Sequence, residues 1–330
     1  MAQNLLLTST HRRVGGLLGT CIDSAPMSAP SPYAPLIAGV PVRDDQVDLL
    51  GGRTRLWVYG PESARHRIVF LHGLRGDHHG LEPIVAHLDG GPAGVQVVVP
   101  DLPGFGASPP LPGDPHDVVG YAAWTRELLA AVAPAGDAVL AGHSFGSIVA
   151  TAALAAAPAP AVRALVLVNP IAASALAGPR RVMTGVTVAY HRLAAALPER
   201  VGTALLRHPL MTRIASVAMA TTHDRDLRRW IHAEHGRYFS TFADRRSLLE
   251  AFHASVGNDV AGFAADVDVP TLLVAGEHDD IAPLATQQAL AGRFADARLA
   301  AVPGTGHLAH YEAPAAVARE ISAFLATLPA

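Results

Sequence analysis

Six short apolar runs alternate with helix-like segments along most of the chain, and this alternation constrains the fold more than any other feature. The runs cover residues 68–71, 95–99, 138–141, 164–168, 271–275 and 298–302. Three of them, 68–71, 138–141 and 164–168, are apolar at every position. Strands of a parallel sheet that is covered by helices on both sides have this character. The sequence therefore predicts a doubly wound α/β fold.

The segments between these runs have helical character at 81–88, 118–132, 147–157, 284–294 and 315–325. Ahead of the first run, residues 47–50 and 55–59 flank Gly51-Gly52, which predicts a hairpin with the glycines in its turn. The alternation breaks between Pro170 and about Gly262, where helical periodicity continues without strands. We interpret residues 171–261 as a helical insertion over a core made of residues 46–170 and 262–330.

Residues 1–45 differ from the rest in composition, and the stretch 24–35 contains four prolines. We expect a flexible leader here, in which Met27 is an alternative start. The leader lacks the order of charges followed by a long apolar run that an export signal has. The single cysteine, Cys21, excludes an internal disulfide and a cysteine-rich metal site. A cytoplasmic location fits this composition.

The charge of the chain argues against nucleic acid as a partner. Its formal net charge is -3, and its 25 basic residues are arginines scattered along the sequence. Such a chain has no basic field for a phosphate backbone. No apolar run approaches the roughly 20 residues that a membrane span needs.

The motif Gly142-His143-Ser144-Phe145-Gly146 lies where a predicted strand turns directly into a predicted helix. A turn this tight strains the central residue and requires small neighbours two positions away on each side, which the two glycines provide. Ligands of open parallel sheets bind at the carboxyl ends of the strands. Ser144 is therefore a candidate nucleophile, and the alternative is a glycine-rich turn with a helix-capping serine.

A serine hydroxyl needs a histidine base and a carboxylate that orients the base. Asp279 and His307 each follow one of the apolar runs, so the strand ends of one sheet can bring them to Ser144. Asp280 and His310 are the neighbouring alternatives. Asn169, which also follows a run, cannot supply a charge.

An oxyanion that forms during acyl transfer also needs hydrogen-bond donors. The amide of Phe145, at the amino end of the predicted helix, is one candidate. The Leu74 amide is the other, because the loop His72-Gly73-Leu74-Arg75-Gly76 follows the first apolar run and its glycines permit a close approach of the backbone.

Taken together, these motifs resemble the α/β-hydrolase superfamily from about Val47 to the C-terminus. The resemblance is carried by His72-Gly73, Asp101-Leu102-Pro103-Gly104-Phe105-Gly106-Ala107-Ser108, Gly142-His143-Ser144-Phe145-Gly146, Gly276-Glu277-His278-Asp279 and Gly306-His307, with Glu312 and Pro314 downstream. It implies a mostly parallel eight-stranded sheet with helices on both faces, a Ser-Asp-His triad and a helical cap after the sixth strand.

The resemblance also disfavours some branches of the superfamily. Haloalkane dehalogenases and epoxide hydrolases of this fold use an aspartate nucleophile, whereas position 144 is serine. Lipases with an HGGG-type oxyanion loop are a poor match too, because Arg75 and Asp77-His78-His79 stand where those lipases have further glycines.

We therefore expect a carboxylesterase-like serine hydrolase (EC 3.1.1) that forms an acyl-enzyme on Ser144. Its expected substrate is a small or medium ester, thioester or lactone with an apolar portion, and no metal or organic cofactor is expected. Acyl transfer, carbon-carbon bond hydrolysis or perhydrolysis, as in cofactor-free haloperoxidases, are alternatives for the same triad. A ligand-binding protein without turnover is a third possibility. The sequence gives no indication of an oligomeric state.

Other polar residues have simpler interpretations. We expect His78 and His79 to face water, with substrate contact as the alternative. His232 and His235 are spaced as two metal ligands on one helix face, but no third ligand is obvious. Asp101 is interpreted as structural. Solvated helix faces explain the arginine pairs better than an acidic substrate does; the pairs are Arg180-Arg181, Arg228-Arg229 and Arg245-Arg246.

Overall fold

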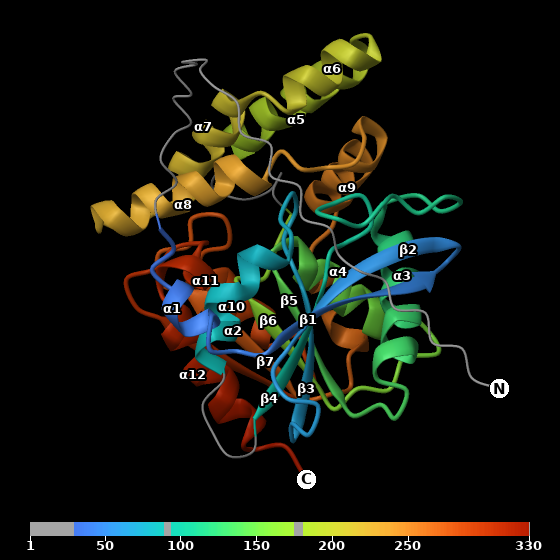
Figure 1. The fold of residues 1–330 in the computed structure, drawn as a ribbon, viewed down its shortest axis with the longest axis vertical. Coiled ribbons are helices and arrows are strands. Elements are labelled where there is room, and N and C mark those ends of the chain that lie inside the picture. The colour runs from blue at the N-terminus through green and yellow to red at the C-terminus, as the bar shows by residue number, and fades with distance from the viewer. Residues whose placement is uncertain (1–29, 89–93, 175–180, 330) are drawn as a thin grey trace, which may run out of the picture.

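The computed structural model describes residues 30–88, 94–174 and 181–329. Within them, eight strands form one sheet in the order β1-β2-β4-β3-β5-β6-β7-β8 (Figure 1). Strand β2 pairs antiparallel with β1 and β4, and all other pairs are parallel. The strands are β1 Val42–Leu49, β2 Gly52–Tyr59, β3 His66–Leu71, β4 Val95–Pro100, β5 Ala138–His143, β6 Ala164–Val168, β7 Thr271–Gly276 and β8 Ala297–Val302. The predicted mostly parallel eight-stranded sheet is confirmed.

Two apolar cores, one on each face of the sheet, explain why runs such as 68–71 are apolar at every position. In β3, Val69 and Leu71 point into one core while Ile68 and Phe70 point into the other. Side chains of α3 Val118–Val132, α4 Phe145–Ala155 and α10 Leu284–Ala291 complete the first core. The second core is closed by α2 Glu82–Leu88 and α12 Pro314–Leu325. The prediction of helices on both faces is therefore confirmed.

The hairpin differs in detail from the prediction. Leu49 pairs with Gly52, so the turn consists of Leu50 and Gly51, both at positive φ (50° and 74°). A two-residue turn of this kind requires positive φ at both central residues. Gly52 belongs to β2, and the prediction that both glycines form the turn is wrong.

The fold also begins earlier in the chain than predicted. β1 starts at Val42, and a short helix, α1 Ala34–Ile37, precedes it. The first five residues of β1 are exposed and three consecutive ones are charged, so they lack the apolar alternation by which a strand is recognised. The expected leader boundary at residue 45 consequently lies too far along the chain. Cys21 and Met27 lie outside the described residues.

In the described part of the chain between β6 and β7 there are five helices, and together they are called the helical segment here. They are α5 Arg181–Ala196, α6 Glu199–Leu206, α7 Pro209–Met219, α8 Arg225–Tyr238 and α9 Arg245–Gly257, followed by the 3-10 turns η2 Val260–Gly262 and η3 Ala264–Asp266. Helices α5 to α8 occupy one end of the longest axis of the molecule (Figure 1). Among the described residues, no helix combines the length and apolar character that crossing a membrane requires.

Candidate active site

Ser144 occupies a strained turn between β5 and α4, with φ 52° and ψ −117°. A Cβ atom on Gly142 would lie 2.2 Å from the carbonyl oxygen of Gly146, and one on Gly146 would lie 2.4 Å from that of Leu71. Both positions therefore require glycine. The Ser144 side chain makes no capping hydrogen bond to α4, so the alternative of a helix-capping serine does not fit.

The three residues predicted as a triad meet at the carboxyl ends of β5, β7 and β8. Nε2 of His307 lies 2.9 Å from Oγ of Ser144, and Nδ1 of His307 lies 2.8 Å from Oδ2 of Asp279. Since the carboxylate is an acceptor, Nδ1 carries the proton and Nε2 is free to accept the serine proton. The neighbouring candidate His310 instead packs on the ring of His143, with ring centroids 3.9 Å apart.

Asp279 is fully buried and each of its oxygens accepts hydrogen bonds. Oδ1 accepts from the amides of Ile281 and Ala282 at 2.8 and 3.0 Å, and Oδ2 accepts from Nδ2 of Asn169 at 3.0 Å as well as from His307. Burial alone would raise the pKa of Asp279, but His307 and these hydrogen bonds outweigh it and hold the pKa below its ordinary value. The carboxylate is thus kept ionised beside the imidazole.

The loop after β3 passes directly against Ser144. A Cβ atom on Gly73 would lie 3.3 Å from Cβ of Ser144, and Nδ1 of His72 fixes the loop by a 2.8 Å hydrogen bond to the Gly73 carbonyl. Within the described part of the chain, the amides of Leu74 and Phe145 donate no hydrogen bond to protein acceptors. Both are therefore available to an oxyanion.

Arg75 connects this loop to the helical segment. It has positive φ (63°), its Nε donates to the Phe239 carbonyl at the end of α8, and its Nη2 donates to the Leu206 carbonyl at the end of α6, each at 2.8 Å. Its guanidinium also lies 5.6 Å from the ring centroid of Phe242. Burial lowers the pKa of Arg75 to about 10, so it remains a cation at neutral pH.

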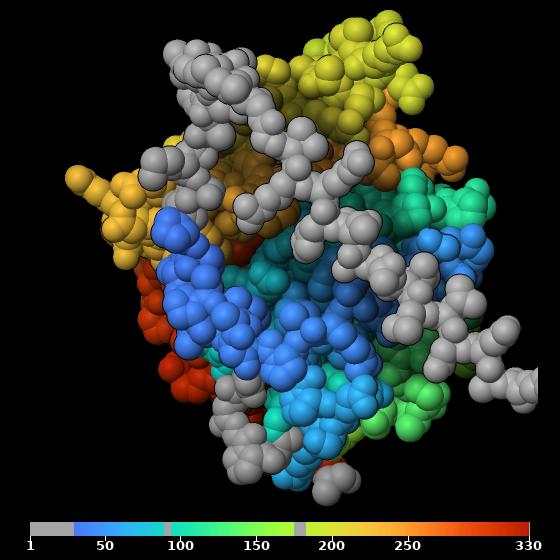
Figure 2. All heavy atoms as spheres, in the orientation of Figure 1, coloured from blue at the N-terminus to red at the C-terminus, as the bar shows by residue number. Residues whose placement is uncertain are grey.

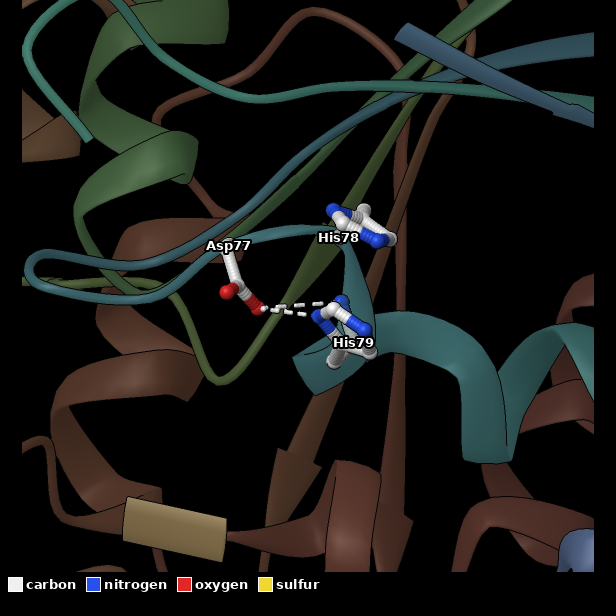
Figure 3. Close-up of side chains that lie close together, drawn as sticks. All are labelled: Asp77, His78 and His79. Carbon is white, nitrogen blue, oxygen red and sulfur yellow. Dashed lines mark hydrogen bonds and ion pairs between the residues drawn. The ribbon is translucent and has the colours of Figure 1, made fainter. Parts of the chain in front are cut away.

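Asp77, His78 and His79 bring potential metal-ligating atoms within 4.8 Å of one another (Figure 3). The two imidazoles belong to a row of four rings. The ring centroids of Trp57 and His78 lie 3.3 Å apart, those of His78 and His79 3.9 Å, and those of His79 and Tyr238 4.1 Å. Nδ1 of each imidazole already lies within hydrogen-bond distance of a carboxylate, at 3.0 Å from Asp101 for His78 and at 3.2 Å from Asp77 for His79. We assign these residues to holding the loop between β2 and α8.

The prediction that both histidines face water is wrong for His78, which is 6% exposed. Oδ1 of Asp101 accepts from the backbone amide of His78 at 2.8 Å and lies 3.0 Å from its ring Nδ1, while Oδ2 accepts from the Ala107 amide. This agrees with a structural role for Asp101. Sequence periodicity could not show the burial, because it depends on Trp57 from a distant strand.

The two histidines of α8 and four of the arginines singled out in the sequence have protein partners. Nδ1 of His232 and Nδ1 of His235 lie 2.6 and 2.7 Å from the same Ser216 hydroxyl, an arrangement that needs no metal. Arg229 and Arg246 form surface ion pairs. Arg228 and Arg245 donate to backbone carbonyls. Arg180 lies outside the described residues.

Two residues with a clear place at the site were not assigned a role from the sequence. Asn169, set aside because it carries no charge, donates to Asp279 and also to the carbonyl of Gly306 at 3.1 Å. Glu312 accepts from the amides of Thr221 and Thr222 and from Gly306. It therefore ties the loop of His307 to the connection between α7 and α8.

A small pocket of ≈ 10 Å³ borders His307. Apolar residues, among them Met219 and Ile281, line it together with the polar residues Thr221, His278 and Asp280. A larger hollow of ≈ 410 Å³ lies elsewhere, between the helical segment's α9 and the start of α6, and charged residues such as Arg245 and Glu250 line it. The larger hollow contains no residue of the triad, so we place the site at His307.

Buried histidines make acid destabilisation a direct expectation. Burial lowers the pKa of His143 and of His235 to about 3. An unfolded chain binds these protons near pH 6.5, so the folded state loses stability as pH falls from that value toward 3. At about pH 5 each histidine should lower the free energy of unfolding by roughly 2 kcal/mol.

Urea unfolding at about pH 7.5 and about pH 5 measures this difference. His235→Gln should reduce the loss on acidification, because glutamine does not titrate. His278→Gln is the matched control, since the His278 side chain is 64% exposed. If acidification lowers the free energy of unfolding equally in wild type and in His235→Gln, burial of His235 is not a cause of the acid destabilisation.

The comparisons with known proteins agree with this architecture. A sequence model of the alpha/beta hydrolase family matches residues 68–320. No curated protein matches the sequence closely enough to count as a relative. Among solved structures, the chain is similar to the enol-lactonase from Burkholderia xenovorans LB400, with TM-score 0.68 and 21% identity over 86% of this chain and 100% of that one.

Two esterases show a comparable likeness. A thermophilic esterase from Thermogutta terrifontis has TM-score 0.67 and 20% identity, over 86% of this chain and 98% of that one. The esterase from Exiguobacterium antarcticum has TM-score 0.67 and 16% identity, over 86% and 100%. At these identities the likeness shows the shared fold alone.

Proposed function

The chain belongs to the alpha/beta hydrolase family, and on that basis we propose that it is a serine hydrolase with Ser144, His307 and Asp279 as its catalytic triad. The observation that carries the proposal is the continuous path from Oγ of Ser144 through His307 to Asp279, with links of 2.9 and 2.8 Å. This path ends at a nucleophile turn whose flanking glycines are sterically required.

In the proposed mechanism, His307 takes the Ser144 proton at Nε2 while Oγ attacks the acyl carbon. Asp279 stabilises the imidazolium that results. The amides of Leu74 and Phe145 donate to the oxyanion of the tetrahedral intermediate. The leaving group departs with the proton from Nε2, and a water molecule deprotonated by His307 then releases the acyl group and restores the serine.

We propose an ester, thioester or lactone with an apolar acyl portion as the substrate class. Met219 and Ile281 border the small pocket at His307 and offer apolar contacts there, beside the polar side chains of Thr221, His278 and Asp280. The esterases and the lactonase that share the fold act on bonds of this class, and the proposal extends that chemistry to this chain. We further propose that the helical segment acts as the cap that shapes the acyl pocket.

Hydrolysis of a panel of p-nitrophenyl esters, a thioester and a lactone tests this function. Wild type should turn over at least one of them, and His307→Ala should not. Product analysis with a competing alcohol or peroxide as acceptor separates hydrolysis from acyl transfer and perhydrolysis. Turnover that is unaffected by loss of His307 would refute the mechanism, and specific ligand binding without any turnover would favour a binding protein.

Arg75 is expected to position the oxyanion loop, because its side chain anchors the residue next to Leu74 to α6 and α8. Arg75→Met should lower kcat about 10- to 100-fold with a smaller change in KM, since a displaced donor acts mainly on the transition state. Arg75→Lys keeps the positive charge but cannot donate to both carbonyls in the same geometry. Its kcat should therefore lie between those of wild type and Arg75→Met.

Steady-state kinetics and thermal unfolding together distinguish positioning from simple stabilisation. Arg229→Met, on the exposed part of α8 where Arg229 pairs with Asp226, is the matched control. A lower melting temperature of Arg75→Met with unchanged kcat would mean that Arg75 only stabilises the fold.

A further inference from the structure

Helix α7 has an inverted distribution of polar and apolar residues. Its buried residues are Thr212 and Ser216, whereas Leu210, Ile214 and Val217 are 57%, 47% and 55% exposed. The three apolar residues follow the spacing i, i+4, i+7 and so lie on one face. An ordinary surface helix shows the opposite arrangement: its apolar face is buried against the protein and its polar face is in contact with water.

The buried polar face of α7 is satisfied within the protein. Ser216 contacts the imidazoles of His232 and His235, and the Thr212 hydroxyl lies 3.2 Å from that of Ser240. These contacts fix the rotation of α7 about its axis. The outward direction of its apolar face is therefore built into the packing against α8.

The exposed apolar character extends to the neighbouring helices. Among the described residues, ten large apolar side chains are exposed, and seven of them lie on α5, α6 and α7. The seven are Met183, Val186, Leu193, Val201, Leu210, Ile214 and Val217. In Figure 2 these helices form one end of the molecule. Exposed apolar residues that are concentrated on a few helices in this way point to an interaction surface.

The charge of α5 to α7 indicates what the partner is. Residues 181–219 contain five arginines and one glutamate, in a chain whose formal net charge is -3. Arg192, Arg200, Arg207 and Arg213 are exposed. A second copy of the chain, docked through the same face about a two-fold axis, would bring these cations together and repel. An anionic partner would be attracted.

We propose that α5, α6 and α7 dock on an anionic lipid surface. Apolar side chains would enter the boundary between headgroups and acyl chains, while the arginines remain at the level of the headgroups, as in helices that lie in the membrane interface. This docking does not depend on the reaction proposed above. If both hold, acyl esters held in a lipid surface would be supplied beside the cap.

Vesicle flotation with the full chain tests the docking, using phosphatidylcholine vesicles with and without phosphatidylglycerol. Wild type should float with the anionic vesicles and lose binding as salt is raised. Ile214→Glu should bind at least about ten-fold more weakly. Val119→Glu, on α3, is the matched control because Val119 is 72% exposed outside this surface. Arg213→Gln should weaken binding about five-fold, on anionic vesicles only.

Thermal unfolding checks that each variant is folded, and Leu210→Glu replaces Ile214→Glu if that variant is not. Ser144→Ala should float like wild type, so that failure of the reaction and failure of the docking are separable. The proposal is overturned if wild type does not float, or if Ile214→Glu floats equally well. A concentration-dependent dimer that Ile214→Glu dissociates, without vesicle binding, would assign the surface to a second copy instead.

Discussion

Ser144→Ala is expected to lower kcat for an ester substrate by about 10⁶-fold, the loss that removal of a triad serine produces. The hydroxyl of Ser144 is the group hydrogen-bonded to Nε2 of His307, and no neighbouring hydroxyl contacts that nitrogen within the described residues. Binding should change much less than turnover, because the donors to the oxyanion remain. Steady-state assays of p-nitrophenol release measure this loss of kcat.

The matched control is Ser322→Ala, which removes an exposed hydroxyl on α12. That variant should retain wild-type kinetics. A Ser144→Ala protein with activity within ten-fold of wild type would exclude Ser144 as the nucleophile, and the ester cleavage would then have to come from another group.

Asp279→Asn should lower kcat/KM by about 10⁴-fold while the fold is retained. All four groups that contact the carboxylate are donors: His307, Asn169 and the amides of Ile281 and Ala282. An asparagine must place its NH₂ group against at least one of them. If it faces His307, the imidazole adopts the other tautomer, and Nε2 then carries the proton and can no longer accept one from Ser144.

Asp280→Asn is the control for this prediction and should lower kcat/KM by less than ten-fold, because the carboxylate that is hydrogen-bonded to His307 is that of Asp279. Kinetics and thermal unfolding are measured for both variants. If Asp280→Asn is the more damaging of the two, the acid of the triad has been assigned to the wrong residue.

The core of the fold could be predicted because its signals are local. The strand predicted at 164–168 and the helix predicted at 118–132 agree with β6 and α3 at both ends. β1 was placed five residues too late because its early residues are exposed on both sides and carry no apolar alternation. In the turn, Leu50 adopts positive φ although glycine is the residue that favours it.

The positions of Ser144, Asp279 and His307 could be predicted because each follows a strand in a short glycine-containing loop. Asn169, Arg75 and Glu312 could not, because their contacts reach residues more than 85 positions away in the chain. No local pattern in the sequence indicates such distant partners. The packing of the helical segment decides the contacts of Arg75 and Glu312, and the order of β6, β7 and β8 in the sheet decides those of Asn169.

The most direct test of the central claim is to map the site of covalent labelling by a fluorophosphonate probe with peptide mass spectrometry. Our account predicts a single adduct on the peptide that contains Ser144, formed by wild type, strongly slowed in His307→Ala and absent from Ser144→Ala. Ester hydrolysis by a protein that carries no adduct, or an adduct on a different residue, would contradict the proposal that Ser144 is the nucleophile.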